Sequence, residues 1–219
     1  MGSYLNPGNK GFQESLNSEI YVDKTGLIEK TNEVLDTRQK FLCVSRPRRF
    51  GKSMAADMLA AYYERGEDSA ELFERLKISK AESYEKNRNQ YDVIKVNMQE
   101  FLSMTHSMDE MLSMLQKYLI FDLTDHFENV RFRDENNLIQ VMKDIYSKMK
   151  HSFVILIDEW DCLFREYQQD QEAQKKYLDF LRAWLKDKDY VALAYMTGIL
   201  PIKKYGSHSA LNMFTEYSM

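Results

Sequence analysis

Positions 45–53 of the chain read Ser45-Arg46-Pro47-Arg48-Arg49-Phe50-Gly51-Lys52-Ser53. A short apolar run at 40–45 leads into this segment, and a stretch with helically spaced apolar residues follows it. A strand, a loop and a helix in this order present backbone N–H groups at a helix N-terminus, where the helix dipole favours the negative charge of a phosphate. Lys52 suits the β- and γ-phosphates of a nucleotide, and the Ser53 hydroxyl suits Mg²⁺. The segment therefore predicts a nucleotide-phosphate loop.

The loop departs from the common pattern G-x-x-x-x-G-K-[ST], because Arg46 stands at the position of the first glycine and Pro47 stiffens the turn. Gly51 still permits the close backbone approach that a Cβ atom would block. Taken alone, the segment could also be a basic surface turn with a helix start at Ser53. The residues expected to contact the nucleotide are Arg46, Pro47, Arg48, Arg49, Phe50, Gly51, Lys52, Ser53 and Met54.

A second motif, about 100 residues further along, supports the first. The apolar run 153–157 is followed at once by Asp158 and Glu159, as expected for a strand that is buried on both faces of a parallel sheet and ends at the ligand-binding edge. We expect Asp158 to hold Mg²⁺ together with Ser53, and Glu159 to take a proton from the water that attacks the γ-phosphate. The alternative is a core strand whose Asp158 caps the next helix.

The acid pair favours an ATPase, and the absence of an Asn-Lys-x-Asp guanine-reading motif disfavours a GTPase. A further apolar run, 190–196, ends at Thr197, a residue that we expect to place the attacking water or to sense the γ-phosphate. The alternative for Thr197 is a local hydrogen bond to the backbone at a strand end.

Composition limits the class of protein. The chain has 219 residues, 44% of them hydrophobic, which suits one α/β domain with a sizeable core. A formal net charge of −4 gives no bulk basic footprint for nucleic acid, although local basic patches exist at the loop and at Lys203 and Lys204. Two cysteines form no disulfide framework, and no segment is long and apolar enough for a membrane span or a signal peptide. We therefore expect a cytoplasmic protein.

Strand and helix patterns alternate, which predicts a mainly parallel sheet covered by helices on both faces. Together with the phosphate loop and the acid pair, this indicates a three-layer P-loop NTPase fold of the ASCE/AAA-like type. We expect strands at 40–45, 92–97, 153–157 and 189–196, and helices at 23–34, 51–65, 107–129, 134–150 and 170–187. Residues 1–35 are expected to pack as an N-terminal segment on an ATPase core at 36–219. Only four strands precede the segment 211–219, so the chain is expected to stop before the last strand and the helical lid, as the N-terminal part of a larger protein.

Several of these motifs, in this order, resemble the bacterial AAA-ATPase-like family from about Asn6 to Met219. The resemblance rests on Tyr21-Val22-Asp23-Lys24-Thr25, the run 46–53, the Asp158-Glu159 strand end, Thr197-Gly198-Ile199 and Leu211-Asn212. It accounts for Arg46 at the first glycine position. It implies the roles given above for Lys52, Ser53, Asp158 and Glu159, with ATP and Mg²⁺ as ligands, and it places Tyr21 and Asp23 near the adenine.

Members of this family often carry a C-terminal PD-(D/E)xK nuclease-like domain, so ATP-dependent nucleic-acid processing through such a domain is one alternative to an ATPase switch. A second is a nucleotide-gated module with little turnover, and a third is a phosphotransferase, for which we find no acceptor site. A homo-oligomer or a C-terminal partner domain is a further expectation, because such enzymes often complete their sites with an arginine from a neighbour. Arg165 and Arg182 could supply it, although a surface position on a helix is the simpler interpretation of both.

Overall fold

The structure is a computed structural model and describes residues 2–202 and 211–218. Its strands are β1 (Phe41–Ser45), β2 (Asp92–Asn97), β3 (Phe153–Asp158), β4 (Val191–Gly198) and β5 (Thr215–Ser218). Its helices are α1 (Lys10–Leu16), α2 (Gly26–Val34), α3 (Lys52–Tyr63), α4 (Ala70–Phe73), the 3₁₀-helix η1 (Lys77–Lys80), α5 (Tyr84–Asn87), α6 (Met98–Ser103), α7 (Met108–His126), α8 (Leu138–Met149), α9 (Cys162–Glu166) and α10 (Gln171–Leu185).

The strands form one parallel sheet in the order β2-β3-β4-β1-β5. Alternate residues of the central strand β3 face opposite sides: Val154 and Leu156 join one buried cluster, and Phe153, Ile155 and Ile157 join the other. This division explains why the strand reads as a continuous apolar run rather than an alternating one.

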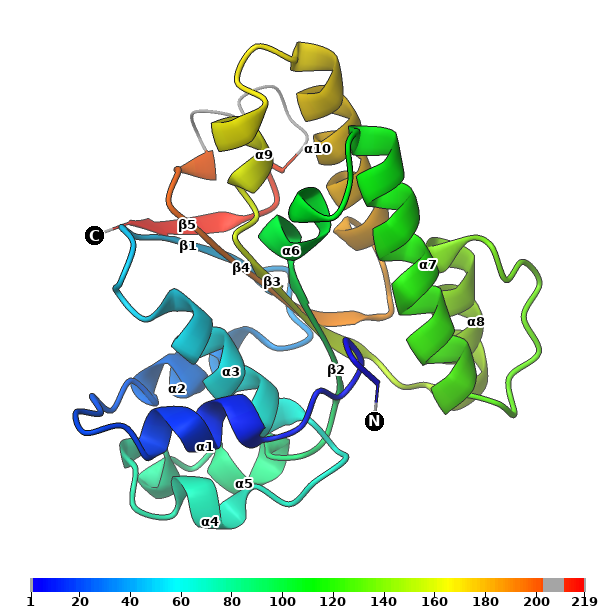
Figure 1. Cartoon of the computed structure of the whole chain (residues 1–219). Coiled ribbons are helices and arrows are strands. Elements are labelled where there is room, and N and C mark those ends of the chain that lie inside the picture. Colours follow the sequence, from blue (N-terminus) through cyan, green and yellow to red (C-terminus); the bar gives the residue numbers. More distant parts are fainter. Residues whose placement is uncertain (1, 203–210, 219) are drawn as a thin grey trace.

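Helices cover both faces of the sheet (Figure 1). Helices α1 to α5 lie on one face, where Phe12 of α1, Ile28 of α2 and Met58 of α3 share a buried cluster. Helices α6 to α10 cover the other face, where Leu119 of α7 and Trp184 of α10 are completely buried. The predicted three-layer α/β fold is confirmed.

Local signals define the longer helices. The Ser107 side chain accepts a hydrogen bond from the N–H of Glu110 and so begins α7, and Asn137 does the same for Gln140 at the start of α8. Asp170 begins α10 in this way, through the N–H of Ala173. These side chains satisfy N–H groups that a helix start leaves unpaired, so the helix boundaries lie within a few residues of those predicted.

The expectation of only four strands in this sequence is wrong. Thr215–Ser218 form β5, which pairs with β1 in register from Leu42–Thr215 to Ser45–Ser218. The pairing satisfies the outer edge of β1, whose N–H and C=O groups would otherwise lack strand partners. The Phe214 ring also packs against Phe41, with ring centroids 5.5 Å apart. A run of four residues carries too weak a periodic signal to be recognised without its neighbour.

Candidate nucleotide-binding site

The segment 46–51 connects the end of β1 to the start of α3 at the carboxyl edge of the sheet. Gly51 lies just before α3 with φ = 72°, a left-handed conformation that glycine adopts without strain. Arg49 is also left-handed, with φ = 69°, and residues 47–50 are exposed. The loop therefore presents backbone and cationic side chains to solvent at a helix N-terminus, as the sequence predicts.

Lys52 begins α3 and is largely buried, with 7% of its surface exposed. Its ammonium group donates hydrogen bonds to the carbonyl oxygens of Arg46 and Pro47, each at 3.1 Å. The lysine thus lies under its own loop and satisfies two carbonyls there. An anion held by the loop would lie within reach of the same ammonium group, which carries three N–H donors.

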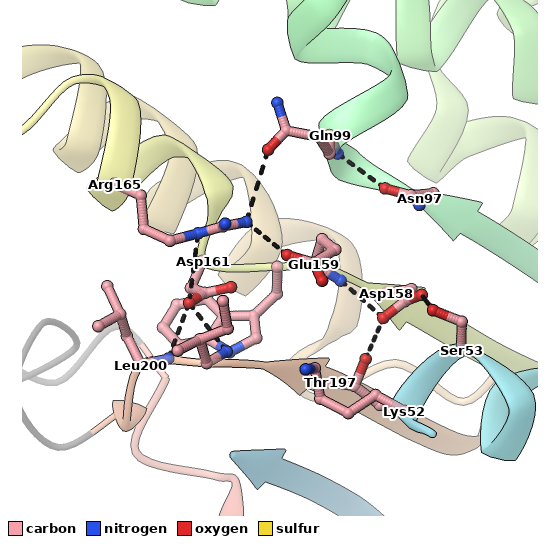
Figure 2. Close-up of polar contacts among 12 residues, drawn as sticks. Lys52, Ser53, Asn97, Gln99, Asp158, Glu159, Asp161, Arg165, Thr197 and Leu200 are labelled. Atoms are coloured by element: carbon pink, nitrogen blue, oxygen red, sulfur yellow. Dashed lines mark hydrogen bonds and ion pairs between the residues drawn. The ribbon is translucent and has the colours of Figure 1, made fainter. Parts of the chain in front are cut away.

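Asp158 ends β3 and connects three elements (Figure 2). One carboxylate oxygen accepts a hydrogen bond from the Ser53 hydroxyl of α3 at 2.5 Å, and the other accepts one from the Thr197 hydroxyl of β4. The N–H of Glu159 also donates to this carboxylate, at 3.0 Å. The structure therefore brings together three of the predicted site residues, although they are 39 to 144 positions apart in the chain.

Glu159 points elsewhere. Its backbone is left-handed, with φ = 52°, which is strained for a residue with a side chain. Figure 2 shows its carboxylate turned to the Arg165 guanidinium of α9, with which it forms an ion pair, while Asp158 faces Ser53 and Thr197. Arg165 also lies 3.5 Å from the side-chain oxygen of Gln99 and 3.7 Å from Asp161. The arginine that was expected on a helix surface is thus mostly buried and engages its own chain.

Asp161 was not singled out from the sequence, although it follows Asp158 by three positions. It is completely buried, and one of its oxygens accepts hydrogen bonds from the N–H groups of Ile199 and Leu200 at 3.0 and 2.7 Å. These contacts fasten the chain immediately after β4 to the turn after β3. Gly198, at the end of β4, packs closely against the turn after β3. A Cβ atom at this position would come within 2.7 Å of the Trp160 ring and 2.8 Å of Asp161, so only glycine fits without displacing them.

Tyr21 and Asp23, the residues expected near the adenine, lie in the segment before α2. The Asp23 carboxylate accepts hydrogen bonds from the Thr25 N–H and hydroxyl and from the Lys77 N–H. Burial alone would raise the pKa of this carboxyl, but the bonds from Thr25 and Lys77 bring the pKa below its ordinary value. Asp23 therefore anchors its own segment, and its side-chain hydrogen bonds are with Thr25, just before α2, and with Lys77 of η1 rather than with the loop.

Tyr21 lines a hollow of about 290 Å³ with Phe50, Met54 and Arg49. Burial, helped by the nearby Asp23 charge, raises the pKa of Tyr21 to about 12, so its phenol stays neutral. Phe50 is 54% exposed and Met54 38%, which is unusual for large apolar side chains that lie so close together. The structure thus joins these four predicted residues around one open apolar hollow beside the loop.

Two further observations concern the whole of the described chain. Within residues 2–202 and 211–218, no helix is both long and apolar enough to cross a membrane. The same residues gather no group of three or more His, Cys, Asp or Glu side chains that could hold a metal ion.

Comparisons with known proteins show what the chain is similar to. A protein of Azotobacter chroococcum mcd 1, described as "Uncharacterized protein in vnfD 5'region", is 24% identical over 212 residues, which cover 91% of this chain and 37% of that protein. The chain thus spans little more than a third of that relative's length. The family model described as "Predicted AAA-ATPase" matches residues 8–207, and such a family suggests a nucleotide-binding domain. Because this match covers most of the chain, the chain belongs to the AAA-ATPase-like family.

Proposed function

We propose that this domain binds ATP with Mg²⁺ at the loop 46–53 and hydrolyses the terminal phosphate. The observation that carries the proposal is the hydrogen bond from Ser53 to Asp158, with Thr197 on the second oxygen of the same carboxylate. It joins the loop helix, the acidic strand end and β4 at one point of the carboxyl edge. Ligands bind at this edge in open α/β sheets.

The chain's own residues divide the work. The N–H groups at the start of α3 and the Lys52 ammonium bind the phosphates. To do so, Lys52 gives up its hydrogen bonds to the carbonyl oxygens of Arg46 and Pro47 and donates to phosphate oxygens instead. Arg46, Pro47, Arg48 and Arg49 shape the loop around the phosphates, and Thr197 positions Asp158. The base lies in the hollow beside Tyr21, Phe50 and Met54.

Ser53 and Asp158 would hold Mg²⁺, since a hydroxyl and a carboxylate are the hard oxygen donors that this ion prefers. A single protein carboxylate suits a magnesium ion that takes its other ligands from phosphates and water, in agreement with the absence of a larger ligand cluster among the described residues. When bound, the ion neutralises charge that develops on the phosphate oxygens.

Glu159 takes a proton from the attacking water, which requires its carboxylate to leave Arg165. That ion pair favours a second candidate, a nucleotide-gated module with little turnover of its own. In either case we propose that the domain acts as part of a larger protein, because the longer relative has most of its length outside the matched region.

Calorimetry with ATP and Mg²⁺ tests binding, on the wild-type chain and on Lys52→Ala. Loss of a charge-assisted contact should weaken binding by about 10- to 100-fold. Lys117→Ala, at an exposed lysine of α7 on the opposite face of the sheet, is the matched control and should bind as the wild type does. Equal binding by Lys52→Ala and the wild type, or none by a folded wild type, would contradict the proposed site.

Phosphate release then separates the two candidates. An ATPase loses turnover in Glu159→Gln while it keeps its affinity for ATP, because the substitution removes the base and leaves the phosphate contacts in place. A gated module shows the same low phosphate release in the wild type and in Glu159→Gln. The two results exclude each other.

A further inference from the structure

A second lysine reaches the phosphate loop from outside it. The Lys24 ammonium donates a hydrogen bond to the Phe50 carbonyl at 2.8 Å. The same nitrogen would lie 2.8 Å from a Cβ atom built on Gly51. Lys24 therefore covers the Phe50–Gly51 peptide, at the point where the loop enters α3.

The backbone around Lys24 is held in place on both sides. Asp23, which precedes it, accepts hydrogen bonds from the Thr25 N–H at 2.8 Å and from the Lys77 N–H at 2.8 Å. Thr25, which follows it, is completely buried, and its hydroxyl accepts a bond from the Ile78 N–H at 3.2 Å. These anchors direct the intervening lysine to the loop. They give the Asp23 and Thr25 positions a task that does not require contact with a ligand.

Among the described residues, the Lys24 charge has no acidic partner. In the described part of the chain, Lys24 forms no salt bridge. An ammonium group has three N–H donors, and the Phe50 carbonyl uses one of them. The remaining donors and the full positive charge are thus available to an anion at the loop.

Two hollows share Lys24, Phe50 and Gly51 among their lining residues. One is the hollow of about 290 Å³ that contains Tyr21 and Met54. The other, of about 370 Å³, lies between α2, α3, β1 and β5 and is lined by Leu27, Val44 and Tyr217 among others. With the base in the hollow beside Tyr21, as proposed above, and the terminal phosphates on Lys52, the first phosphate would pass close to Lys24.

We propose that Lys24 is a second phosphate-binding lysine, which contacts the α-phosphate of the bound nucleotide. The inference rests on the proposed function, since it assumes a nucleotide whose terminal phosphates lie on Lys52. It divides the phosphate contacts between two lysines from different elements: Lys52 of α3 for the β- and γ-phosphates, and Lys24, which precedes α2, for the α-phosphate. It also explains how the segment before α2 takes part in binding although Asp23 faces away from the loop.

A nucleotide series tests this division, with affinities for ATP, ADP and AMP measured by displacement of a fluorescent ATP analogue. Lys24→Met should weaken all three nucleotides by about tenfold, because each carries an α-phosphate and the variant lacks the charge. Lys52→Ala should weaken ATP and ADP but change AMP by less than about threefold. Lys117→Met is the matched control, and we expect wild-type affinities for it.

Two more variants separate a contact with phosphate from mere support of the loop. Lys24→Arg keeps the charge and should stay within about threefold of the wild type, whereas Lys24→Gln can still donate to Phe50 but is neutral and should behave as Lys24→Met does. Wild-type affinity of Lys24→Met for AMP, or rescue by Gln as complete as by Arg, would overturn the inference. Neither result touches the proposed function if Lys52→Ala has lost ATP, whereas a wild type that binds no ATP would refute both.

Discussion

The phosphate loop and the acidic end of β3 meet through the Ser53–Asp158 hydrogen bond, yet they are built in opposite ways. Residues 47–50 of the loop are exposed, and Arg46, Arg48 and Arg49 form no ion pair within the described residues. At the strand end, Asp158 is 3% exposed and Asp161 is completely buried. Both carboxylates already accept hydrogen bonds from other elements of the fold.

The difference indicates which half of the site a ligand has to organise. Cations without acidic partners repel one another until an anion arrives, so the loop gains most from binding. At the strand end, Asp158 already accepts hydrogen bonds from Ser53 and Thr197, and Asp161 already accepts them from Ile199 and Leu200. We infer that the acidic half is preorganised and that the loop adapts to it.

Substitution of Asp161 should give the largest loss of folding stability among the variants that compare the acidic half with the loop. Asp161→Ala would leave the half-buried N–H groups of Ile199 and Leu200 without acceptors and remove a completely buried carboxylate, which should lower the free energy of unfolding by about 3 kcal/mol. Urea unfolding followed by circular dichroism measures this change. Asp161→Asn keeps one acceptor oxygen and should lose less.

The matched change in the loop is Arg48→Ala, for which we expect a loss of less than about 0.5 kcal/mol, because the side chain is exposed. Equal losses for Arg48→Ala and Asp161→Ala would show that the strand end is no more fixed than the loop.

The residues that could be predicted from sequence are those whose placement is local. Lys52 and Ser53 follow from a helix start, and Asp158 follows from a strand end. Parallel strands bring such ends to one edge of the sheet, so these residues meet without any knowledge of the packing between them. The same reasoning predicts the α/β fold and its four longer strands.

The positions that escaped prediction depend on partners distant in sequence. Asp161 is informative because it binds Ile199 and Leu200, nearly 40 positions away, and Arg165 because it lies against Glu159 and Gln99. From the sequence alone, Asp161 is indistinguishable from any acidic residue in a turn, and Arg165 from any basic residue on a helix surface. The strand β5 escaped for a related reason, since its four residues form a strand only against β1.

Two glycine substitutions compare the stability of the two halves, because each adds a single methyl group and no polar or charged group. In Gly198→Ala the new methyl group would meet the buried Trp160 ring at 2.7 Å, so we expect a loss of about 2 kcal/mol in the free energy of unfolding. In Gly51→Ala the nearest atom is the flexible tip of Lys24 at 2.8 Å, which can move away. There the cost is the left-handed backbone, about 1 kcal/mol.

Thermal or urea unfolding of both variants gives the order directly. A larger loss in Gly51→Ala than in Gly198→Ala would mean that the loop is the more tightly packed half, contrary to the comparison above. ATP affinity should show the reverse order, because Gly51 belongs to the proposed phosphate loop, whereas Gly198 packs against Trp160 and Asp161.

The smallest effect concerns Glu159, the proposed base, which belongs to the acidic half but would have to leave Arg165 for the proposed hydrolysis. Its ion pair with Arg165 is mostly buried, with side-chain exposures of 21% and 18%. A double-mutant cycle with Glu159→Gln and Arg165→Gln should therefore give a coupling of about 1 kcal/mol in the absence of nucleotide. The exposed pair Lys176–Asp109, at 3.2 Å, is the control and should give less than about 0.5 kcal/mol.

Repeating the Glu159–Arg165 cycle with ATP and Mg²⁺ then asks whether the pair separates on binding. A coupling that falls toward zero with nucleotide would mean that Glu159 leaves Arg165 when the site fills, as hydrolysis requires. A coupling that stays at its nucleotide-free value would keep the carboxylate on α9 and favour the gated module. No coupling in either state would mean that Arg165 does not hold Glu159 in place, so that Glu159, like the loop residues, would be ordered only by a ligand. The preorganised half would then consist of Asp158, Asp161 and Thr197.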